Sequence, residues 1–209
     1  KIHSHKVYVN ALNQLPQICK FPFSKLRGVL RQKIWNCEKY FYWNENYFSQ
    51  SGQDKIIKEF FFRDLKQKST KGYFVEIGAY DGITGSNCYH FEKFYNWKGV
   101  AVEPSSIQFQ KLIKNRKCTL INKAIDKVKR EIEFFEVLEG YTQMSYIDHN
   151  DNNHIQQILS KDSRTKINKQ KIETTTFNTI IENKDINYLS IDTEGNEIDI
   201  LKSIDYEKF

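Results

Sequence analysis

The clearest pattern in the chain is a set of short apolar runs that each lead into a carboxylate. These runs are 73–77, 100–103 and 188–192. Each is short and apolar enough for a buried strand of a parallel sheet. Because the carboxyl ends of parallel strands meet at one edge of the sheet, we expect Glu76, Glu103 and Asp192 to gather at that edge.

A glycine-containing turn follows the first run. Gly78 can adopt backbone angles closed to other residues, as can Gly82 and Gly85, and Ser86 or Asn87 can cap the next helix. That helix is predicted from Phe91, Phe94 and Tyr95. The stretch therefore predicts a strand, a glycine turn and a helix in sequence.

Three further helices are expected where apolar residues recur at helical spacing. One follows the polar turn 49–54 and runs to about residue 66, one spans 105 to about 115, and one follows residue 196. Their apolar faces are predicted to hold, in order, Ile57, Phe60, Phe61 and Leu65; Phe109, Leu112 and Ile113; and Ile198, Leu201 and Ile204.

The remaining segments predict short strands and connections. Strands are expected at 118–122, 131–137 and 171–176, a turn at 123–126, a short helix at 154–159 and a helical turn at 177–182. The stretch 138–153 resembles a loop, suited to a substrate-facing flap or an ordinary surface, and the basic stretch 160–170 is expected to be mobile. The alternation predicts an α/β fold with a doubly wound sheet and helices on both faces.

Residues 1–48 differ from the rest of the chain. They carry few periodic signals, Pro16 and Pro22 interrupt them, and aromatic residues crowd into 35–48. We expect an N-terminal arm or helical extension here and one domain over 49–209. The aromatic cluster suits packing best, and it also suits a lid, a dimer contact or a platform for sugar rings.

Composition excludes several classes. The formal charge of +6 comes from scattered Lys and Arg, so nucleic acid is not favoured and an anionic partner is a weaker option. The four cysteines have neither zinc nor disulfide-framework spacing and fit a reducing compartment, which favours a cytoplasmic location. No stretch is apolar enough for a transmembrane segment, and the first residue is not Met, so a fragment of a longer protein is expected.

The carboxylates around the glycine turn indicate which cofactor it suits. Glu76 and Asp81 would repel a pyrophosphate but favour a sulfonium and an amino group, so S-adenosylmethionine is favoured over NAD or ATP. Alternatively, Glu76 caps turn amides and Asp81 forms an Asx turn. Glu103 lies 25 positions beyond Gly78, near the offset at which an acid binds ribose hydroxyls, although an acid there is also common as a helix cap.

With these motifs in order, the sequence resembles the FkbM-type S-adenosylmethionine-dependent O-methyltransferases. The likeness rests on SQSGQD at 49–54, GYFVEIGAYDGITGSN at 72–87, WKGVAVEPS at 97–105, NKAI at 122–125 and YLSIDTEGNEIDILKSID at 188–205. The resemblance implies a Rossmann-like methyltransferase sheet and methylation of a hydroxyl group, most often on a sugar, glycan or other small molecule.

The motifs, with the resemblance, assign residues to roles. Cofactor-binding residues are expected to be Gln53, Asp54, Glu76, Gly78, Ala79, Asp81, Gly82, Ser86, Asn87, Glu103, Pro104, Ser105, Ala124 and Ile125. By the resemblance, Glu76, Gly78, Asp81 and Gly82 line the methionine end, Glu103 holds the ribose, and Ala124 and Ile125 flank the adenine. Asp192 is the first candidate for the base, followed by Glu194 and His149. Asp192 and Glu194 could instead hold Mg²⁺, which is not favoured because no third ligand is adjacent.

Two questions stay open, the role of the domain and the edge of its sheet. A methyltransferase-like domain could serve as a catalytically weak binding or scaffold domain in a larger glycan-synthesis protein. Sheets of this type continue beyond the strand that ends at Asp192, whereas this chain ends at Phe209. Either a C-terminal part is missing, the last strands are dispensable, or a second copy or neighbouring domain covers the open edge.

Overall fold

The computed structural model describes residues 47–50, 52–65, 71–139, 142–147, 165–181 and 185–208. The chain divides into two units, Lys1–Tyr47 and Phe48–Phe209, and the fold described below belongs to the second. The predicted N-terminal arm, most of the aromatic cluster and the expected helix at 154–159 lie outside the described residues.

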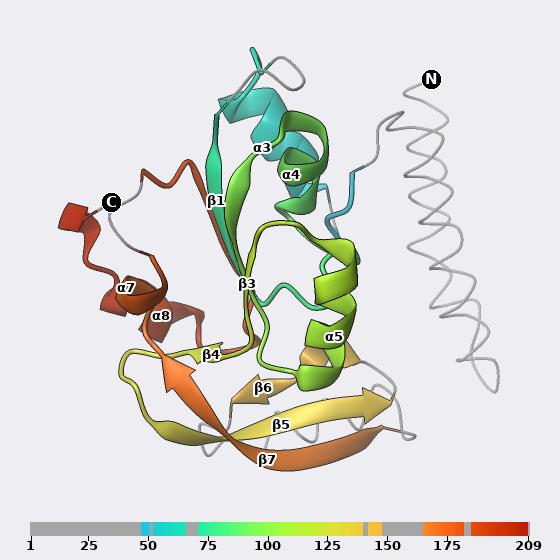
Figure 1. Ribbon diagram of the computed structural model, residues 1–209, viewed down its shortest axis with the longest axis vertical. Helices are drawn as coiled ribbons and strands as arrows, with labels where there is room; N and C mark the ends of the chain where they lie inside the picture. The colour runs from blue at the N-terminus through green and yellow to red at the C-terminus, as the bar shows by residue number, and fades with distance from the viewer. Residues whose placement is uncertain are drawn as a thin grey trace, which may run out of the picture. The chain divides into compact units, whose positions relative to one another are not determined.

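A four-stranded parallel sheet forms the centre of the second unit (Figure 1). Its strands are β1 (Tyr73–Ile77), β2 (Lys98–Val102), β3 (Thr119–Ile121) and β8 (Tyr188–Ile191), in the order β3-β2-β1-β8. The chain moves outward from β1 to β3 and then returns to the other side of β1. This reversal makes the gap between β1 and β8 the topological switch point, and it confirms the predicted doubly wound sheet.

Helices cover both faces of this sheet. On one face lie α3 (Gln53–Phe61), α4 (Tyr89–Tyr95) and α5 (Ser106–Asn115), and on the other lie α7 (Phe177–Ile180) and α8 (Glu197–Ser203). The first face packs Phe74 of β1 against Phe91 of α4, and the second packs Val75 against Phe177 and Ile200. The alternation of side chains along β1 thus supplies both cores.

A second sheet lies below the first in Figure 1 and has the order β4-β7-β5-β6. Its strands are β4 (Ala124–Ile125), β5 (Glu131–Glu139), β6 (Tyr146–Ile147) and β7 (Lys166–Thr175), and the short helix η1 (Thr142–Met144) precedes β6. β5 pairs antiparallel with both β6 and β7, whereas β4 pairs parallel with β7. We call β4 to β7 the hairpin sheet.

Ion pairs connect the two long strands of the hairpin sheet. They join Lys166 to Glu139, Lys169 to Glu133 and Lys171 to Glu131, at 2.6, 2.7 and 2.9 Å. All of these side chains are exposed, so each pair contributes little to the stability. They place opposite charges side by side in the register in which β7 runs along β5.

The hairpin sheet corrects two expectations. The basic stretch 160–170 was expected to be mobile, but β7 begins at Lys166, because pairing with β5 orders a segment whose composition is that of a loop. The turn expected at 123–126 contains a short strand, β4, and Ile125 is buried in the core between the central sheet and α7.

Three predicted helix faces were also wrong in part. Phe60 and Phe61 of α3 are 72% and 73% exposed, and Ile113 of α5 is 47% exposed. The buried position of α8 is Ile200 rather than Ile198 or Leu201. These helices are short, so two apolar stripes fit the same spacing and only the neighbouring sheet decides which stripe is buried.

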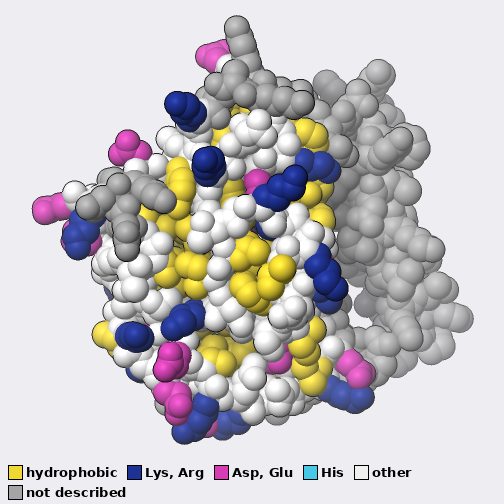
Figure 2. Space-filling model, viewed as in Figure 1, with side chains coloured by type: hydrophobic (Ala, Val, Ile, Leu, Met, Phe, Trp, Pro, Cys, Tyr) yellow, Lys and Arg dark blue, Asp and Glu magenta, His cyan; other side chains and the backbone are white. Residues whose placement is uncertain are grey.

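The surface shows dispersed charge. Figure 2 shows Lys and Arg side chains spread over the visible face, with acidic and apolar groups between them. In the part of the chain that the structure describes, no helix is long and apolar enough to cross a membrane. Cys88 and Cys118 both have free thiols.

The main chain closes tightly at the switch point, where β1 ends. Gly78 has a φ of +86°, and its amide donates to the carbonyl of Val102 at 3.0 Å. A Cβ atom on Gly78 would lie 1.8 Å from the carbonyl oxygen of Asp192. Only glycine lets the two chain segments approach this closely.

Replacing Gly78 with alanine is expected to destabilise the protein by about 3 kcal/mol or more, because a backbone clash adds to the strain of a positive φ. Gly195→Ala is the matched control, since Gly195 also has a positive φ (+126°) but a Cβ atom there would meet nothing within 4 Å. Urea denaturation should rank the two variants in this order. Equal losses would show that strain alone, without the close approach, sets the requirement for glycine.

Candidate active site

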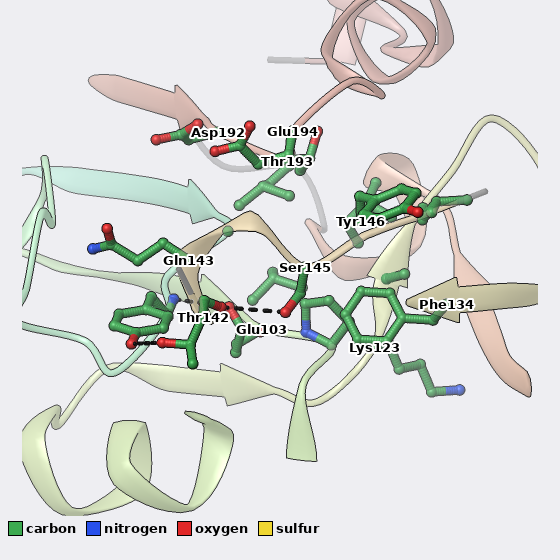
Figure 3. Close-up of a pocket in the computed structure, with 18 residues that line it drawn as sticks. Glu103, Lys123, Phe134, Thr142, Gln143, Ser145, Tyr146, Asp192, Thr193 and Glu194 are labelled. Atoms are coloured by element: carbon green, nitrogen blue, oxygen red, sulfur yellow. Dashed lines mark hydrogen bonds between the residues drawn. The ribbon is translucent and has the colours of Figure 1, made fainter. Parts of the chain in front are cut away.

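A cleft opens at the carboxyl ends of the central strands, beside the switch point. Its unfilled space is about 550 Å³, counted to the open mouth. The turn after β1, the ends of β2 and β8, and the hairpin sheet all contribute side chains to it (Figure 3). Ligands of doubly wound proteins bind at this position.

Glu103 is the buried carboxylate of the cleft. It follows β2 directly and is 6% exposed. One of its oxygens accepts a hydrogen bond from the amide of Tyr80, and the other accepts one from the amide of Ser105, both at 2.8 Å. Each oxygen therefore keeps a lone pair for a further donor.

The surroundings of Glu103 bring its pKa near neutral pH. Burial has the largest effect and the charges of Glu136 and Asp81 add to it, so that the pKa of the carboxyl is raised to about 7 although the two amide hydrogen bonds lower it. The carboxyl group therefore changes charge in the physiological range. As a carboxylate it can accept hydrogen bonds from two vicinal hydroxyl groups, one at each oxygen.

Asp192 and Glu194 lie on the opposite side of the cleft, after β8 (Figure 3). The Asp192 side chain is exposed at the mouth of the cleft. Its partial desolvation there raises the pKa of its carboxyl, and the charges of Glu197 and Glu76 raise this pKa further. No described residue donates a hydrogen bond to the Asp192 carboxylate, so its lone pairs are open to the cleft. A carboxylate of raised pKa with open lone pairs suits a general base.

Hydrogen bonds to Glu197 hold the loop that carries Asp192 and Glu194. Glu197 accepts hydrogen bonds from the amides of Thr193 and Gly195 at 2.8 and 3.0 Å. Burial raises the pKa of Glu197, but these amide hydrogen bonds outweigh it and lower the pKa. Glu197 thus remains ionised and holds the loop.

The turn between β1 and α4 is joined to the hairpin sheet. The hydroxyl of Tyr80 lies 2.5 Å from that of Thr142 in η1, and Tyr80 has a φ of +50°. Thr142 is also tied to Ser145, whose hydroxyl donates to its carbonyl at 3.2 Å. Segments far apart in the sequence therefore form one wall of the cleft.

Seven residues predicted for the site line the cleft. They are Gly78, Glu103, Pro104, Ala124, Ile125, Asp192 and Glu194. Thr142, Ser145 and Tyr146, from the predicted flap, line it as well. His149 lies outside the described residues.

Other predicted residues support the turn and do not line the cleft. Glu76 is 3% exposed, and its carboxylate accepts from Ser86, the amide of Asn87 and Arg116 at 2.8, 2.9 and 2.8 Å. Asp81 accepts from the amide of Ile83 at 2.9 Å, which is the Asx turn that the sequence left open. In this structure both carboxylates act on the main chain of the turn.

Four more of the predicted residues have packing or capping roles. Ala79 packs against Leu112. A Cβ atom on Gly82 would clash with Leu112 and Arg116. Ser105 caps α5 by accepting from the amide of Gln108 at 3.2 Å, and Asn87 donates to Ser190 at 2.9 Å.

Gln53 and Asp54 do not line the cleft and lie at the start of α3. Gln53 opens α3 and is exposed to solvent. Asp54 is fully buried and accepts from the amides of Phe48 and Ser49 at 2.7 and 3.2 Å. Ser49 in turn forms a parallel bridge to Gly85, so this motif anchors the glycine turn from outside the cleft.

The sequence interpretation missed the apolar wall of the cleft. Phe134 and Ile147 of the hairpin sheet line it together with Tyr80 and Lys123. The strand at 131–137 was predicted from its apolar content, but nothing local indicated that it would pack at the carboxyl ends of the central strands. Among the described residues no group of three or more His, Cys, Asp or Glu side chains could hold a metal ion.

Comparisons with known proteins found a family model and a solved structure to which the chain is similar. The family model described as the methyltransferase FkbM domain matches residues 76–209. A solved structure, methyltransferase FkbM from Methylobacillus flagellatus KT, is 13% identical, with a TM-score of 0.41 and coverage of 93% of this chain and 44% of that chain. The chain thus spans less than half the length of that protein. No curated protein matches the sequence.

Arg116→Met is expected to destabilise the protein by about 3–5 kcal/mol, because it leaves the buried carboxylate of Glu76 without its cation. The Arg116 and Glu76 side chains are 0% and 4% exposed and lie 2.8 Å apart. Lys171→Met, which breaks a fully exposed pair, is the control and should change the stability little. Urea denaturation measures both, and similar losses for the two variants would contradict a structural role for the buried pair.

Proposed function

Because the chain belongs to the FkbM methyltransferase family, we propose that it is an S-adenosylmethionine-dependent O-methyltransferase that acts on a hydroxyl group of a sugar or glycan. The observation that carries the proposal is Glu103. Its buried carboxylate faces the cleft with one lone pair open on each oxygen, which suits the vicinal hydroxyls of a ribose.

The charge of the cleft also suits this cofactor. Among the described lining residues the charged side chains are Glu103, Asp192, Glu194 and Lys123, three acids against one base. A pyrophosphate would be repelled by such a lining, whereas a sulfonium cation and an amino group would be favoured. This supports S-adenosylmethionine over NAD or ATP.

The apolar wall suits an adenine ring. Ala124 and Ile125 are 3% and 2% exposed, and Phe134 of the hairpin sheet lies beside them in the lining of the cleft. Small and aromatic apolar side chains are the usual lining of such a pocket. We therefore assign adenine binding to these three residues and ribose binding to Glu103.

We assign the methyl-transfer chemistry to the residues opposite Glu103, at the end of β8. When bound, S-adenosylmethionine supplies an electrophilic methyl group, and positioning of the acceptor oxygen provides much of the rate. We assign to Asp192 the role of accepting the proton of the acceptor hydroxyl, because its pKa is raised and its lone pairs are open. We assign to Glu194, which lines the cleft beside Asp192, the role of orienting the acceptor, and His149 stays a prediction.

Calorimetric titration with S-adenosylmethionine and S-adenosylhomocysteine tests the proposal, with ATP and NAD as controls. We expect micromolar binding of the first pair only. Glu103→Ala should weaken it by about 1–3 kcal/mol, or roughly 5- to 150-fold, through the lost hydrogen bonds to the diol. Glu139→Ala, at an exposed position of β5, should leave it unchanged. A folded chain that binds neither compound would favour the scaffold alternative.

Asp192→Asn is expected to abolish most turnover while leaving the affinity for S-adenosylhomocysteine within about twofold, because the amide keeps the shape but loses the basicity. Methyl transfer to a panel of sugar acceptors measures turnover, and calorimetry measures affinity. Glu197→Gln serves as a comparison, since it weakens the support of the loop rather than the base itself. Full activity of Asp192→Asn would remove Asp192 as the base.

A further inference from the structure

A second buried carboxylate lies behind Glu103 and is not explained by the roles assigned so far. Glu136, on β5 of the hairpin sheet, is 3% exposed. One of its oxygens accepts a hydrogen bond from the hydroxyl of Ser105, and the other accepts from the side-chain amide of Gln170 at 3.4 Å. No ion pair to Glu136 is formed within the part of the chain that the structure describes. Burying a carboxylate is costly unless hydrogen bonds compensate it, and for Glu136 this compensation comes from Ser105 and Gln170.

Ser105 joins the two carboxylates. Its amide donates to Glu103 at 2.8 Å, and its hydroxyl donates to Glu136. The same hydroxyl accepts from the amide of Gln108 at 3.2 Å, at the start of α5. A serine hydroxyl has one proton, so the acceptor of that proton decides how the hydroxyl is turned.

A helix cap alone does not account for this arrangement. The cap needs only a lone pair of the Ser105 hydroxyl, which would be available whether its proton pointed to Glu136, to water or elsewhere. What Glu136 adds is a fixed orientation of Ser105 and, through the Ser105 amide, of the carboxylate that faces the cleft. β5 also supplies Phe134 to the lining of the cleft. The same strand therefore contributes to the proposed adenine pocket through Phe134 and contacts the Glu103 side through Glu136 and Ser105.

We propose that Glu136 is a positioning residue, which acts through Ser105 to orient the carboxylate of Glu103 and so couples the hairpin sheet to the ligand site. The identity of the ligand, S-adenosylmethionine, rests on the proposed function. The link between the two carboxylates does not, because it is a property of the chain itself.

The proximity of Glu136 to Glu103 is expected to affect how ligand affinity depends on pH. The groups that face Glu103 are the amides of Tyr80 and Ser105, and the charges nearest it are those of Glu136 and Asp81. Lys123 lines the same cleft. Because Glu103 must be ionised to accept from both hydroxyls of a diol, affinity is expected to fall as the pH drops below about 7. Neutralising Glu136 removes a repulsive charge, which lowers the pKa of Glu103 and moves this fall to lower pH.

Three variants test the proposal against one control. Glu136→Gln removes the charge but keeps an oxygen for the Ser105 hydroxyl, whereas Glu136→Ala and Ser105→Ala each break the link. Glu133→Gln removes a carboxylate from the same strand, β5, that is paired with Lys169 at the surface. The affinity for S-adenosylhomocysteine is measured by calorimetry across the neutral pH range, and circular dichroism checks the fold of each variant.

Glu136→Gln should keep its affinity for S-adenosylhomocysteine at alkaline pH and shift the fall in affinity to lower pH. Glu136→Ala and Ser105→Ala should each weaken affinity at least fivefold at alkaline pH. The double variant should be no weaker than Ser105→Ala alone, because the link that Glu136→Ala breaks runs through the hydroxyl that Ser105→Ala already removes. Glu133→Gln should change neither quantity. Additive losses in the double variant, or an unshifted pH profile in Glu136→Gln, would overturn the proposal.

A second readout needs no ligand. The carboxyl carbon of Glu103, assigned in ¹³C spectra by its loss in Glu103→Gln, should titrate near neutral pH in the wild type and at lower pH in Glu136→Gln. If S-adenosylhomocysteine does not bind but this shift is seen, the proposed function fails and the positioning role stands. If binding occurs and Glu103 titrates identically in both proteins, the positioning role fails and the proposed function stands.

Discussion

The contact between the backbone of Gly78 and the carbonyl of Asp192 is the constraint on which the site depends. It brings the ends of β1 and β8 together at the switch point, with no room for a side chain between them. Because the approach is made by main chain, the position of Asp192 relative to the glycine turn does not vary with side-chain rotamers. The same turn presents the amide of Tyr80 to Glu103, so both sides of the cleft are set by one piece of backbone.

The edge of the central sheet could be predicted well from the sequence, because its signals are local. An apolar run followed by an acid and a turn residue marks the end of a buried strand, and Glu103 and Asp192 were both found in this way and line the cleft. Glu76 carries the same signal but points to the opposite face of β1 from Ile77, where Arg116 meets it. Strand alternation separates residues 76 and 77, but it does not say which face the ligand uses.

The hairpin sheet could not be inferred, because its contribution depends on contacts between distant segments. Phe134 reaches the cleft only because β5 packs at the carboxyl ends of the central strands, and Lys166 lies in a strand only because β5 is beside it. Ile200 and Phe60 show the same limit for helices, since the partner surface decided which apolar residue was buried. The missed residues are thus those whose role is defined by a neighbour far away in the chain.

The two halves of the cleft are fastened by interactions of different kinds. The turn after β1 is held by the buried pair of Arg116 and Glu76, from which water is excluded, whereas the strands of the hairpin sheet are joined by exposed pairs such as Lys169 with Glu133. Dissolved ions screen exposed charges over about 10 Å at 0.1 M but hardly reach buried ones. Raising the ionic strength therefore weakens the ion pairs of the hairpin sheet, whose strands stay joined by their backbone ladder, and leaves the buried pair of the glycine turn unscreened. The charges on the two sides of one site thus differ in their response to the surrounding electrolyte.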